Sequence, residues 1–258
     1  MLNTFEDVLI VTVCVALNFA FLMALQHFWP GPARRIHNEM LGWQLSVLGT
    51  TYAVIVGFML YAVWTTFQAA ELNADNEANS LVNVFRLADG LPPDARAEVH
   101  QLAKEYAETV ISQEWPAMHH AENRFAGHPV VQKMWSTVAR VNPTNFGEQT
   151  SMDHALSELS SMTEYRRRRE LQSQSNLPTI LWIVMILGGF ITLFCASLMG
   201  TENFRLHFLQ VLLLTLFISL TLVAIADIDR PFLGTVHVRP SGFERARQTF
   251  NSVPADFH

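Results

Sequence analysis

The sequence predicts an all-α integral membrane protein with four transmembrane helices and a helical region outside the membrane. Only 16% of the 258 residues are charged, against about 25% in soluble domains. Each of four stretches without Asp, Glu, Lys or Arg is at least as long as the roughly 20 residues with which a helix crosses a bilayer. This pattern excludes an ordinary soluble enzyme and leaves little sequence for a nucleic-acid-binding domain. The stretches are residues 8–33, 40–70, 171–201 and 206–226.

The transmembrane segments are expected to be helices. A bilayer offers the backbone no water to bond with, so only helices or a closed barrel can cross it. The strands of a barrel would be short segments of alternating apolar and polar residues, whereas these stretches are long and apolar throughout. Four of the six tryptophans fall near the expected span ends, where an amphipathic ring favours the headgroup layer; they are Trp29, Trp43, Trp64 and Trp182. We expect the spans at about 7–28, 41–67, 178–199 and 206–227.

Four spans give two hairpins, at residues 1–67 and 178–227, separated by a region at 68–177 and followed by a tail at 228–258. Both termini and the separating region then share one side of the membrane. Within about 20 residues of the span ends, the opposite side holds only Arg34, Arg35 and Arg205. The shared side holds nine arginines: Arg86, Arg166, Arg167, Arg168, Arg169, Arg230, Arg239, Arg245 and Arg247. This bias predicts a cytoplasmic region and a bacterial inner-membrane location, although so long a segment can be exported whatever its charge.

The separating region is expected to be helical throughout. The second span should run on as a polar helix to Asp89, until Gly90 and the Pro92–Pro93 pair end it. Apolar residues at helical spacing predict three more helices, starting near Asp94, just before Val130 and at about Ser151. No linker rich in Gly, Pro or Ser sets the region apart, so a helical bundle should continue directly from the membrane helices.

The second span carries two stripes of interest. Small residues at four-residue steps let membrane helices approach closely, and this chain has such a stripe at Gly49, Ala53 and Gly57. The neighbouring stripe is mid-sized and mostly apolar, and it could line a narrow hydrophobic pore that gates by dewetting. It consists of Thr51, Ile55 and Met59. The alternative for this second stripe is ordinary lipid-facing surface.

Charged residues outside the spans suggest further contacts. The run Arg166, Arg167, Arg168 and Arg169 could bind anionic lipid headgroups, at about 1 kcal/mol each, or form an anion-attracting vestibule. A solvated cluster that sets orientation is the alternative. The acids Glu71 and Asp75 could form a cation-attracting ring at a pore mouth, or simply a solvated helix face.

The sequence lacks the motifs of several kinds of catalytic and metal-binding site. The sequence has no GxSxG, HExxH, Gly-rich phosphate loop or CxxC pair, and no charged residue deep in a span. His119, His120 and His128 lie in one loop, but their spacing matches no standard zinc pattern. We therefore expect no enzyme, no cofactor and no metal site.

Four segments resemble a widespread bacterial membrane family of unassigned function, usually labelled bestrophin-like. They are residues 57–92 (GFMLYAVWTTFQAAELNADNEANSLVNVFRLADGLP), 105–118 (EYAETVISQEWPAM), 166–182 (RRRRELQSQSNLPTILW) and 228–240 (IDRPFLGTVHVRP). The most specific part is the turn after the fourth span, formed by Asp229, Pro231, Phe232 and Gly234. That family is distantly related to bestrophins, which are homopentameric anion channels.

The resemblance implies a homo-oligomer, a pentamer by analogy, whose second spans line a central pore for small ions. It also places Asp227 and Asp229 near the calcium clasp of bestrophins. True bestrophins have a run of acids after their Pro-Phe turn, whereas this chain has LGTVHVRP, so a clasp is not expected. The leading hypothesis is an oligomeric ion channel in the bilayer. The alternative is a non-conducting scaffold or signalling adaptor that acts through its helical bundle.

Overall fold

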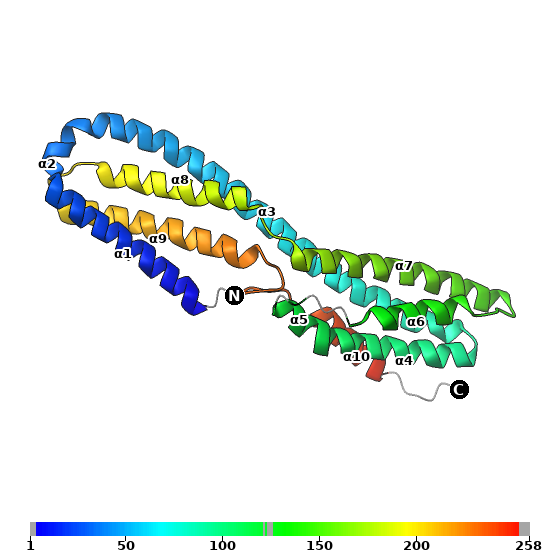
Figure 1. The fold of residues 1–258 in the computed structure, drawn as a ribbon. Helices are drawn as coiled ribbons and strands as arrows, with labels where there is room; N and C mark the ends of the chain where they lie inside the picture. Colours follow the sequence, from blue (N-terminus) through cyan, green and yellow to red (C-terminus); the bar gives the residue numbers. More distant parts are fainter. Residues whose placement is uncertain (1–3, 121, 123–125, 253–258) are drawn as a thin grey trace. The chain divides into compact units, whose positions relative to one another are not determined.

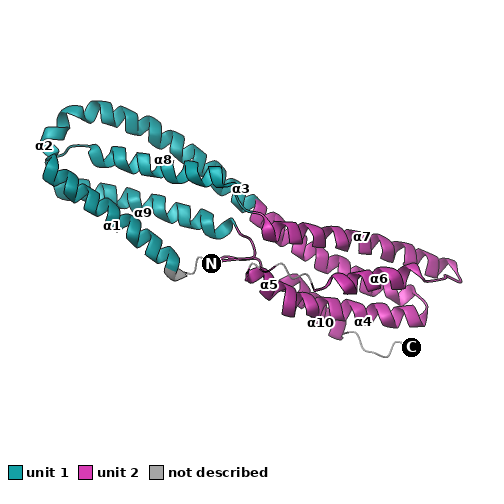
Figure 2. Cartoon of the chain, viewed as in Figure 1, with its two compact units in different colours: residues 1–65, 176–229 teal, residues 66–175, 230–258 magenta. Residues whose placement is uncertain are grey.

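The computed structural model describes residues 4–120, 122 and 126–252. In this part of the chain every regular element is a helix (Figure 1). The chain divides into two compact units, one formed by residues 1–65 and 176–229 and the other by residues 66–175 and 230–258 (Figure 2). The all-α class predicted from the sequence is confirmed.

The first unit contains the membrane helices. They are α1 (Thr4–Phe28), the first part of α3 (Asn38–Leu87), α8 (Thr179–Leu198) and α9 (Phe204–Ile228). All four are long and apolar enough to cross a membrane, which confirms the four predicted spans. The short helix α2 (Gly31–Arg34) and the turn η1 (Arg35–His37) connect α1 to α3. Helix α9 packs beside both α1 and α8 (Figure 1).

One buried apolar cluster of this unit lies where α3, α8 and α9 meet. It contains Val56, Val63, Met185 and Ile225, and Tyr52 packs against it. Most other apolar side chains on these helices are exposed. Because lipid is as apolar as the side chains themselves, such exposure is acceptable in a bilayer.

A close approach between α3 and α8 depends on two adjacent glycines. A Cβ added at Gly188 would lie 2.8 Å from Cδ2 of Tyr52, and one added at Gly189 would lie 2.9 Å from the Tyr52 hydroxyl oxygen. Real Cβ atoms do not approach other atoms so closely. The ring of Tyr52 therefore needs the space that these two glycines leave.

The two hairpin loops of the first unit are also tied together. The side chain of Asn38 donates to the backbone oxygen of Gly200 (2.7 Å) and accepts from its backbone nitrogen (2.8 Å). Nη1 of Arg34 donates to the backbone oxygen of Ser197 (2.7 Å). These bonds join residues more than 160 positions apart, and they fix the turn between α1 and α3 against the turn between α8 and α9.

The second unit is a helical bundle. Besides the remaining part of α3, it contains the turn η2 (Ala88–Gly90), α4 (Pro93–Thr109), the π-helical turn η3 (Val110–Glu114), α5 (Trp115–His119), α6 (His128–Ala139), α7 (Phe146–Gln174) and α10 (Ser241–Ser252). Helix α3 runs to Leu87 without a break, so the predicted polar continuation of the second span is confirmed.

Helix α7 begins about five residues earlier than the apolar pattern predicted. The side chain of Asn145 accepts a hydrogen bond from the backbone nitrogen of Glu148 (2.9 Å). The Glu148 carboxylate reaches back to the backbone nitrogen of Thr144 (2.7 Å). Such reciprocal bonds satisfy the free amides of a first helical turn and stabilise its start.

Helix α10 was not predicted, and it closes the apolar core of this unit. Its side chains Phe243 and Phe250 are almost completely buried. The ring of Phe250 stacks on Phe85 of α3 at 4.5 Å between centroids. The ring of Phe243 lies 5.8 Å from Trp115 and 6.2 Å from Tyr106. Helix α10 of the tail is therefore part of the folded bundle.

Candidate functional site

Helix α3 buries only one side of its membrane-spanning part within the chain. At 100° per residue, the core-facing residues Tyr52, Val56 and Val63 share one side. The opposite side carries large exposed side chains at steps of one or two helical turns, which are Trp43, Val47, Val54 and Tyr61. No signal in the sequence distinguished this face from lipid-facing surface. This exposed side of α3 is the first candidate site, because lipid or another protein can contact it.

The two predicted stripes flank this exposed face. In the predicted pore-lining stripe, Thr51 is exposed, Ile55 is half-buried, and Met59 packs partly against the core. In the predicted packing stripe, Ala53 is exposed, and a Cβ added at Gly49 or Gly57 meets no atom within 4 Å. Within the described chain the small stripe contacts no other helix, so helix packing there stays a prediction about a neighbouring molecule.

The two acids predicted at the pore mouth differ in their contacts: Asp75 has a cation partner, and Glu71 has none among the described residues. Glu71 is exposed on α3. One turn further, Asp75 accepts a hydrogen bond from Arg245 of α10 (3.0 Å). The backbone of α10 passes close by, since a Cβ added at Gly242 would lie 2.6 Å from the Asp75 carboxylate. Asp75 is therefore paired with a cation of its own chain, whereas the side chain of Glu71 is exposed.

The four consecutive arginines of α7 fall into two pairs. Arg167 and Arg168 are exposed, and both bind the carboxylate of Glu164 on the same helix. Arg166 and Arg169 are one turn apart on the opposite side, with only 3% and 0% of their surface exposed. The prediction of lipid or anion contact is wrong for this second pair, because buried carboxylates already bind both guanidinium groups. It remains a prediction for Arg167 and Arg168.

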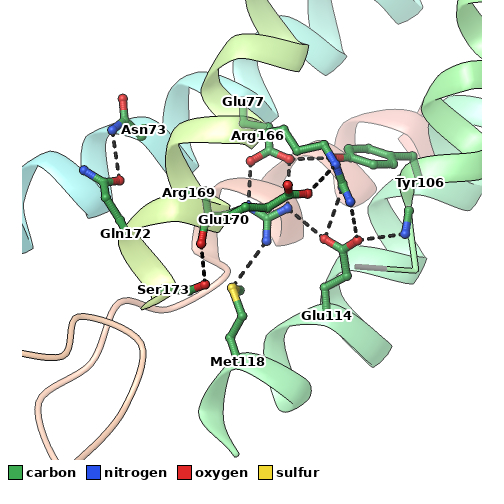
Figure 3. A network of polar contacts seen from close by, with 11 residues as sticks. Asn73, Glu77, Tyr106, Glu114, Met118, Arg166, Arg169, Glu170, Gln172 and Ser173 are labelled. Atoms are coloured by element: carbon green, nitrogen blue, oxygen red, sulfur yellow. Dashed lines mark hydrogen bonds and ion pairs between the residues drawn. The ribbon is translucent and has the colours of Figure 1, made fainter. Parts of the chain in front are cut away.

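The buried arginines form the centre of an ion network in the second unit (Figure 3). Arg169 binds Glu77 of α3 (Nε to Oε2, 2.7 Å) and Glu114 of the π turn (Nη2 to Oε2, 2.8 Å). Arg166 binds the other oxygen of Glu114 (2.8 Å) and donates to the hydroxyl of Tyr106 on α4 (2.7 Å). The Tyr106 hydroxyl in turn donates to Glu77. The network thus joins α3, α4, the π turn and α7.

Surrounding groups complete this network, which we call the buried ion network. The carboxylate of Glu114 also accepts from the backbone nitrogen of Gly127 (2.7 Å), and Glu170 binds Nε of Arg166 (2.8 Å). The guanidinium of Arg169 lies 5.3 Å from the centroid of the Trp115 ring, at a distance suited to a cation–π contact. Partners on several sides hold each charged group in one position.

The charged groups of the network favour the ionised form of their partners. Burial alone would raise the pKa of Glu114, but the charges and hydrogen bonds of Arg169 and Arg166 outweigh it and hold this pKa below its ordinary value. Burial, and then the nearby charge of Glu77, raises the pKa of Tyr106 well above its ordinary value, so the hydroxyl keeps its proton. The arrangement has two buried carboxylates for two buried guanidinium groups. It fits a rigid tie between helices better than acid–base chemistry.

The lowered pKa of Glu114 predicts how stability responds to acid. Since the folded pKa lies below the ordinary value of 4.5, the unfolded chain takes up the proton first as pH falls. The stabilisation is complete above the unfolded pKa and is lost as pH falls through the folded pKa. We expect the free energy of unfolding to fall more steeply between pH 6 and 3 in the wild type than in Glu114→Gln. Exposed Glu108→Gln is the control, and parallel wild-type and Glu114→Gln profiles would refute the prediction.

The turn after the fourth span is built from the predicted signature residues. The Asp229 carboxylate accepts from the backbone nitrogen of Leu177 (2.8 Å) in the first unit. In the second unit, Phe232 packs edge-on against Trp115 (5.7 Å between centroids), and the backbone nitrogen of Val238 donates to the oxygen of Pro231 (2.7 Å). Gly234 has φ 81°, a conformation that side chains with a Cβ rarely adopt. These contacts give each signature residue a structural role.

The described residues contain no group of three or more His, Cys, Asp or Glu side chains placed to hold a metal ion. His119 lies near His237, with ring centroids 4.9 Å apart, and both rings face backbone oxygens of the post-span turn. His128 begins α6. His119 also lies near His120, with ring centroids 5.9 Å apart.

The comparisons with known proteins agree with this architecture. A family model described as the bestrophin-like domain matches residues 12–243. Solved structures of a bacterial bestrophin homologue from Klebsiella pneumoniae are similar in fold. One variant has a TM-score of 0.70 at 10% identity, with 96% of this chain and 100% of that chain covered. A structure phased with zinc has 0.68 at 11%, covering 96% and 99%.

A further variant of the Klebsiella protein has a TM-score of 0.66 at 13% identity, covering 96% of this chain and 100% of that chain. No curated protein sequence matches the chain. Identities this low establish the fold alone, whereas the family model extends over most of the sequence. With its four membrane helices, its helical bundle and this match, the chain belongs to the bestrophin-like family.

Proposed function

We propose that this protein is one subunit of an oligomeric ion channel, with a central pore lined by the second transmembrane helix, α3. The observation that carries the proposal is the exposed face of α3 through the membrane, which has no partner among the described residues of its own chain. Membership of a channel-type family supports it. Copies of α3 around a symmetry axis would give that face a partner and enclose a pathway.

The side chains of α3 suit a hydrophobic constriction. Thr51 is exposed, and Ile55 and Met59 are partly so; a narrow ring of such residues can gate conduction by dewetting. The small residues Gly49, Ala53 and Gly57 would let neighbouring copies approach closely. The exposed acid Glu71, with Asp75 behind it, would then lie at the pore mouth beyond the membrane.

The assembly and its orientation are part of the same proposal. The pentameric state and anion selectivity come from the resemblance to bestrophins. The excess of arginine beside the spans on the bundle's side supports a cytoplasmic bundle and a bacterial inner-membrane location. The exposed pair Arg167 and Arg168 would then face anionic headgroups or attract anions near the cytoplasmic entrance.

Cysteine accessibility tests which face of α3 meets water. In a background with Cys14→Ala and Cys195→Ala, we expect Thr51→Cys, Ile55→Cys and Met59→Cys to react with a charged methanethiosulfonate reagent. Modification should also change the flux, because a pore has water along its wall. Ile183→Cys on the lipid-exposed side of α8 is the matched control. It should stay unmodified.

The competing outcome is a pore along the exposed face of α3 opposite the core. Reaction at Val47→Cys, Val54→Cys and Tyr61→Cys, with Thr51→Cys, Ile55→Cys and Met59→Cys protected, would move the pore to the exposed face opposite the core. Protection of all six positions would contradict a pore along α3 and would favour the scaffold or adaptor alternative.

An ion-flux assay tests conduction itself. Purified protein in liposomes should carry a selective flux, and the same sample should have the mass of a closed oligomer. Removing the exposed charge with Glu71→Gln should change the relative flux of cations and anions if Glu71 lies at the mouth. A monomer without flux would contradict the channel proposal.

A further inference from the structure

A cavity lies at the hairpin ends of the first unit. Its volume is about 450 Å³, within the range of small-molecule sites. It lies between the start of α3, the loop from α8 to α9 and the first turns of α9. Polar groups reach it from Asn38, Gly200, Thr201, His207 and Gln210.

The side chain of His207 lines this cavity and is 95% buried, with 5% of its surface exposed. Its Nε2 atom has no hydrogen-bond partner among the described residues. A buried polar atom without a partner is unfavourable, and native structures normally supply a partner. The cavity is the space from which such a partner can come.

A buried positive charge lies beside the cavity. Arg34 is only 2% exposed, and among the described residues it bonds to the oxygen of Ser197 and the side-chain oxygen of Gln26, neither of which is charged. Its main chain lies against Gly200, which lines the cavity. Buried charges are normally paired, because an unpaired one is costly to keep from water.

No acid in the adjoining loop compensates Arg34. Glu202 pairs with the exposed Arg35 instead. Two tryptophans flank the first hairpin loop, Trp29 and Trp43, and both are exposed. Exposed tryptophans favour the headgroup layer, so the cavity belongs at the depth where lipid phosphates lie.

We propose that this cavity binds a phosphate group, with His207 and Gln210 donating hydrogen bonds to its oxygens and Arg34 supplying the positive charge. Phosphate oxygens accept hydrogen bonds, which His207 donates in the tautomer with its proton on Nε2 and Gln210 donates through its side-chain amide. The volume exceeds that of a single-atom ion. The phosphate belongs either to a phospholipid headgroup or to a free ion, and the proposal does not depend on conduction.

Two arms of one experiment distinguish these sources. Full-length protein in a non-ionic maltoside detergent, which carries no phosphate, is titrated with inorganic phosphate at constant ionic strength, with the melting temperature as readout. In parallel, native mass spectrometry counts phosphatidylglycerol molecules retained after extraction from a mixed bilayer. Ligand at 100 times its Kd stabilises by about 2.7 kcal/mol, which should raise the melting temperature by a few degrees.

The variants are Arg34→Gln and His207→Leu, and the matched control is the exposed neighbour Arg205→Gln. A phosphate-dependent rise that is lost in both variants but kept in the control supports a free-ion site. Retained phosphatidylglycerol that is lost in the same two variants supports a lipid site. His207→Leu keeps the test open should Arg34→Gln fail to fold. Equal behaviour of wild type, His207→Leu and control in both arms would overturn the proposal.

Discussion

Replacing Arg169 by leucine is expected to destabilise the helical bundle by about 3–5 kcal/mol, the usual cost of removing one partner from a buried ion pair. The substitution leaves the carboxylate of Glu77 without its closest cation and removes one of two cations from Glu114. It also removes the cation above the Trp115 ring. Urea unfolding in detergent, followed by tryptophan fluorescence, measures the loss.

Arg168→Leu is the matched control, because it removes the same side chain one position earlier in the same helix. Arg168 is exposed and, among the described residues, pairs only with Glu164, so its loss should change the free energy of unfolding by about 0.5 kcal/mol or less. If both substitutions lowered the free energy of unfolding equally, Arg169 would not be part of a buried ion network.

A double variant separates charge from packing. Arg169→Leu combined with Glu77→Leu removes the cation together with its closest anion, and Arg166 still compensates Glu114. We therefore expect the double variant to be less destabilised than the sum of its single substitutions. A coupling energy of about 0.5–3 kcal/mol is typical for residues in direct contact. Additive effects would contradict a direct interaction between Arg169 and Glu77.

The spans and the long continuation of α3 were predictable because their signals are local. A charge-free stretch and its length define a membrane helix without knowledge of any partner. The end of α3 was equally local, since Gly90 and the Pro92–Pro93 pair interrupt helix geometry. The start of α7 was misplaced only because its capping residues precede the apolar pattern.

The buried ion network was not predicted, because its partners lie far apart in the sequence. Arg169 binds Glu77 and Glu114 across 92 and 55 positions, distances at which no local pattern indicates a pair. Spacing could have separated the arginines, since residues three apart share a helix side. A second overlooked signal was Glu77 itself, an acid within the buried stripe of Ala70, Ala74, Ala78 and Leu81.

The same limit applies to the exposed face of α3. Its apolar residues fit lipid, a pore and a neighbouring subunit equally well on sequence alone. The fold shows that the described part of the chain does not itself cover this face, because Tyr52 and Val56 turn toward α8 and α9. The structure of the assembled protein would identify what covers that side. No local pattern in the sequence of one chain encodes that assembly.

Gly200→Ala is expected to separate the two hairpin loops of the membrane unit. A Cβ at this position would meet the backbone oxygen of Gly31 and would lie 2.5 Å from the backbone nitrogen of Arg35. Backbone atoms cannot move aside as a flexible side chain can, so the loops must part and strain both bonds between Asn38 and Gly200. We expect a loss of about 1–3 kcal/mol, measured as a lower melting temperature in nanodiscs.

Gly49→Ala is the matched substitution, because an added Cβ there meets no atom within 4 Å. In a helix interior alanine is favoured over glycine by up to about 1 kcal/mol, so this variant should be as stable as the wild type or more so. Asn38→Ala removes both bonds without a clash and should fall between the two. If Gly200→Ala proved as stable as Gly49→Ala, the loops could not pack as described. The cavity beside His207 would then lose one of its walls, since Gly200 lines it.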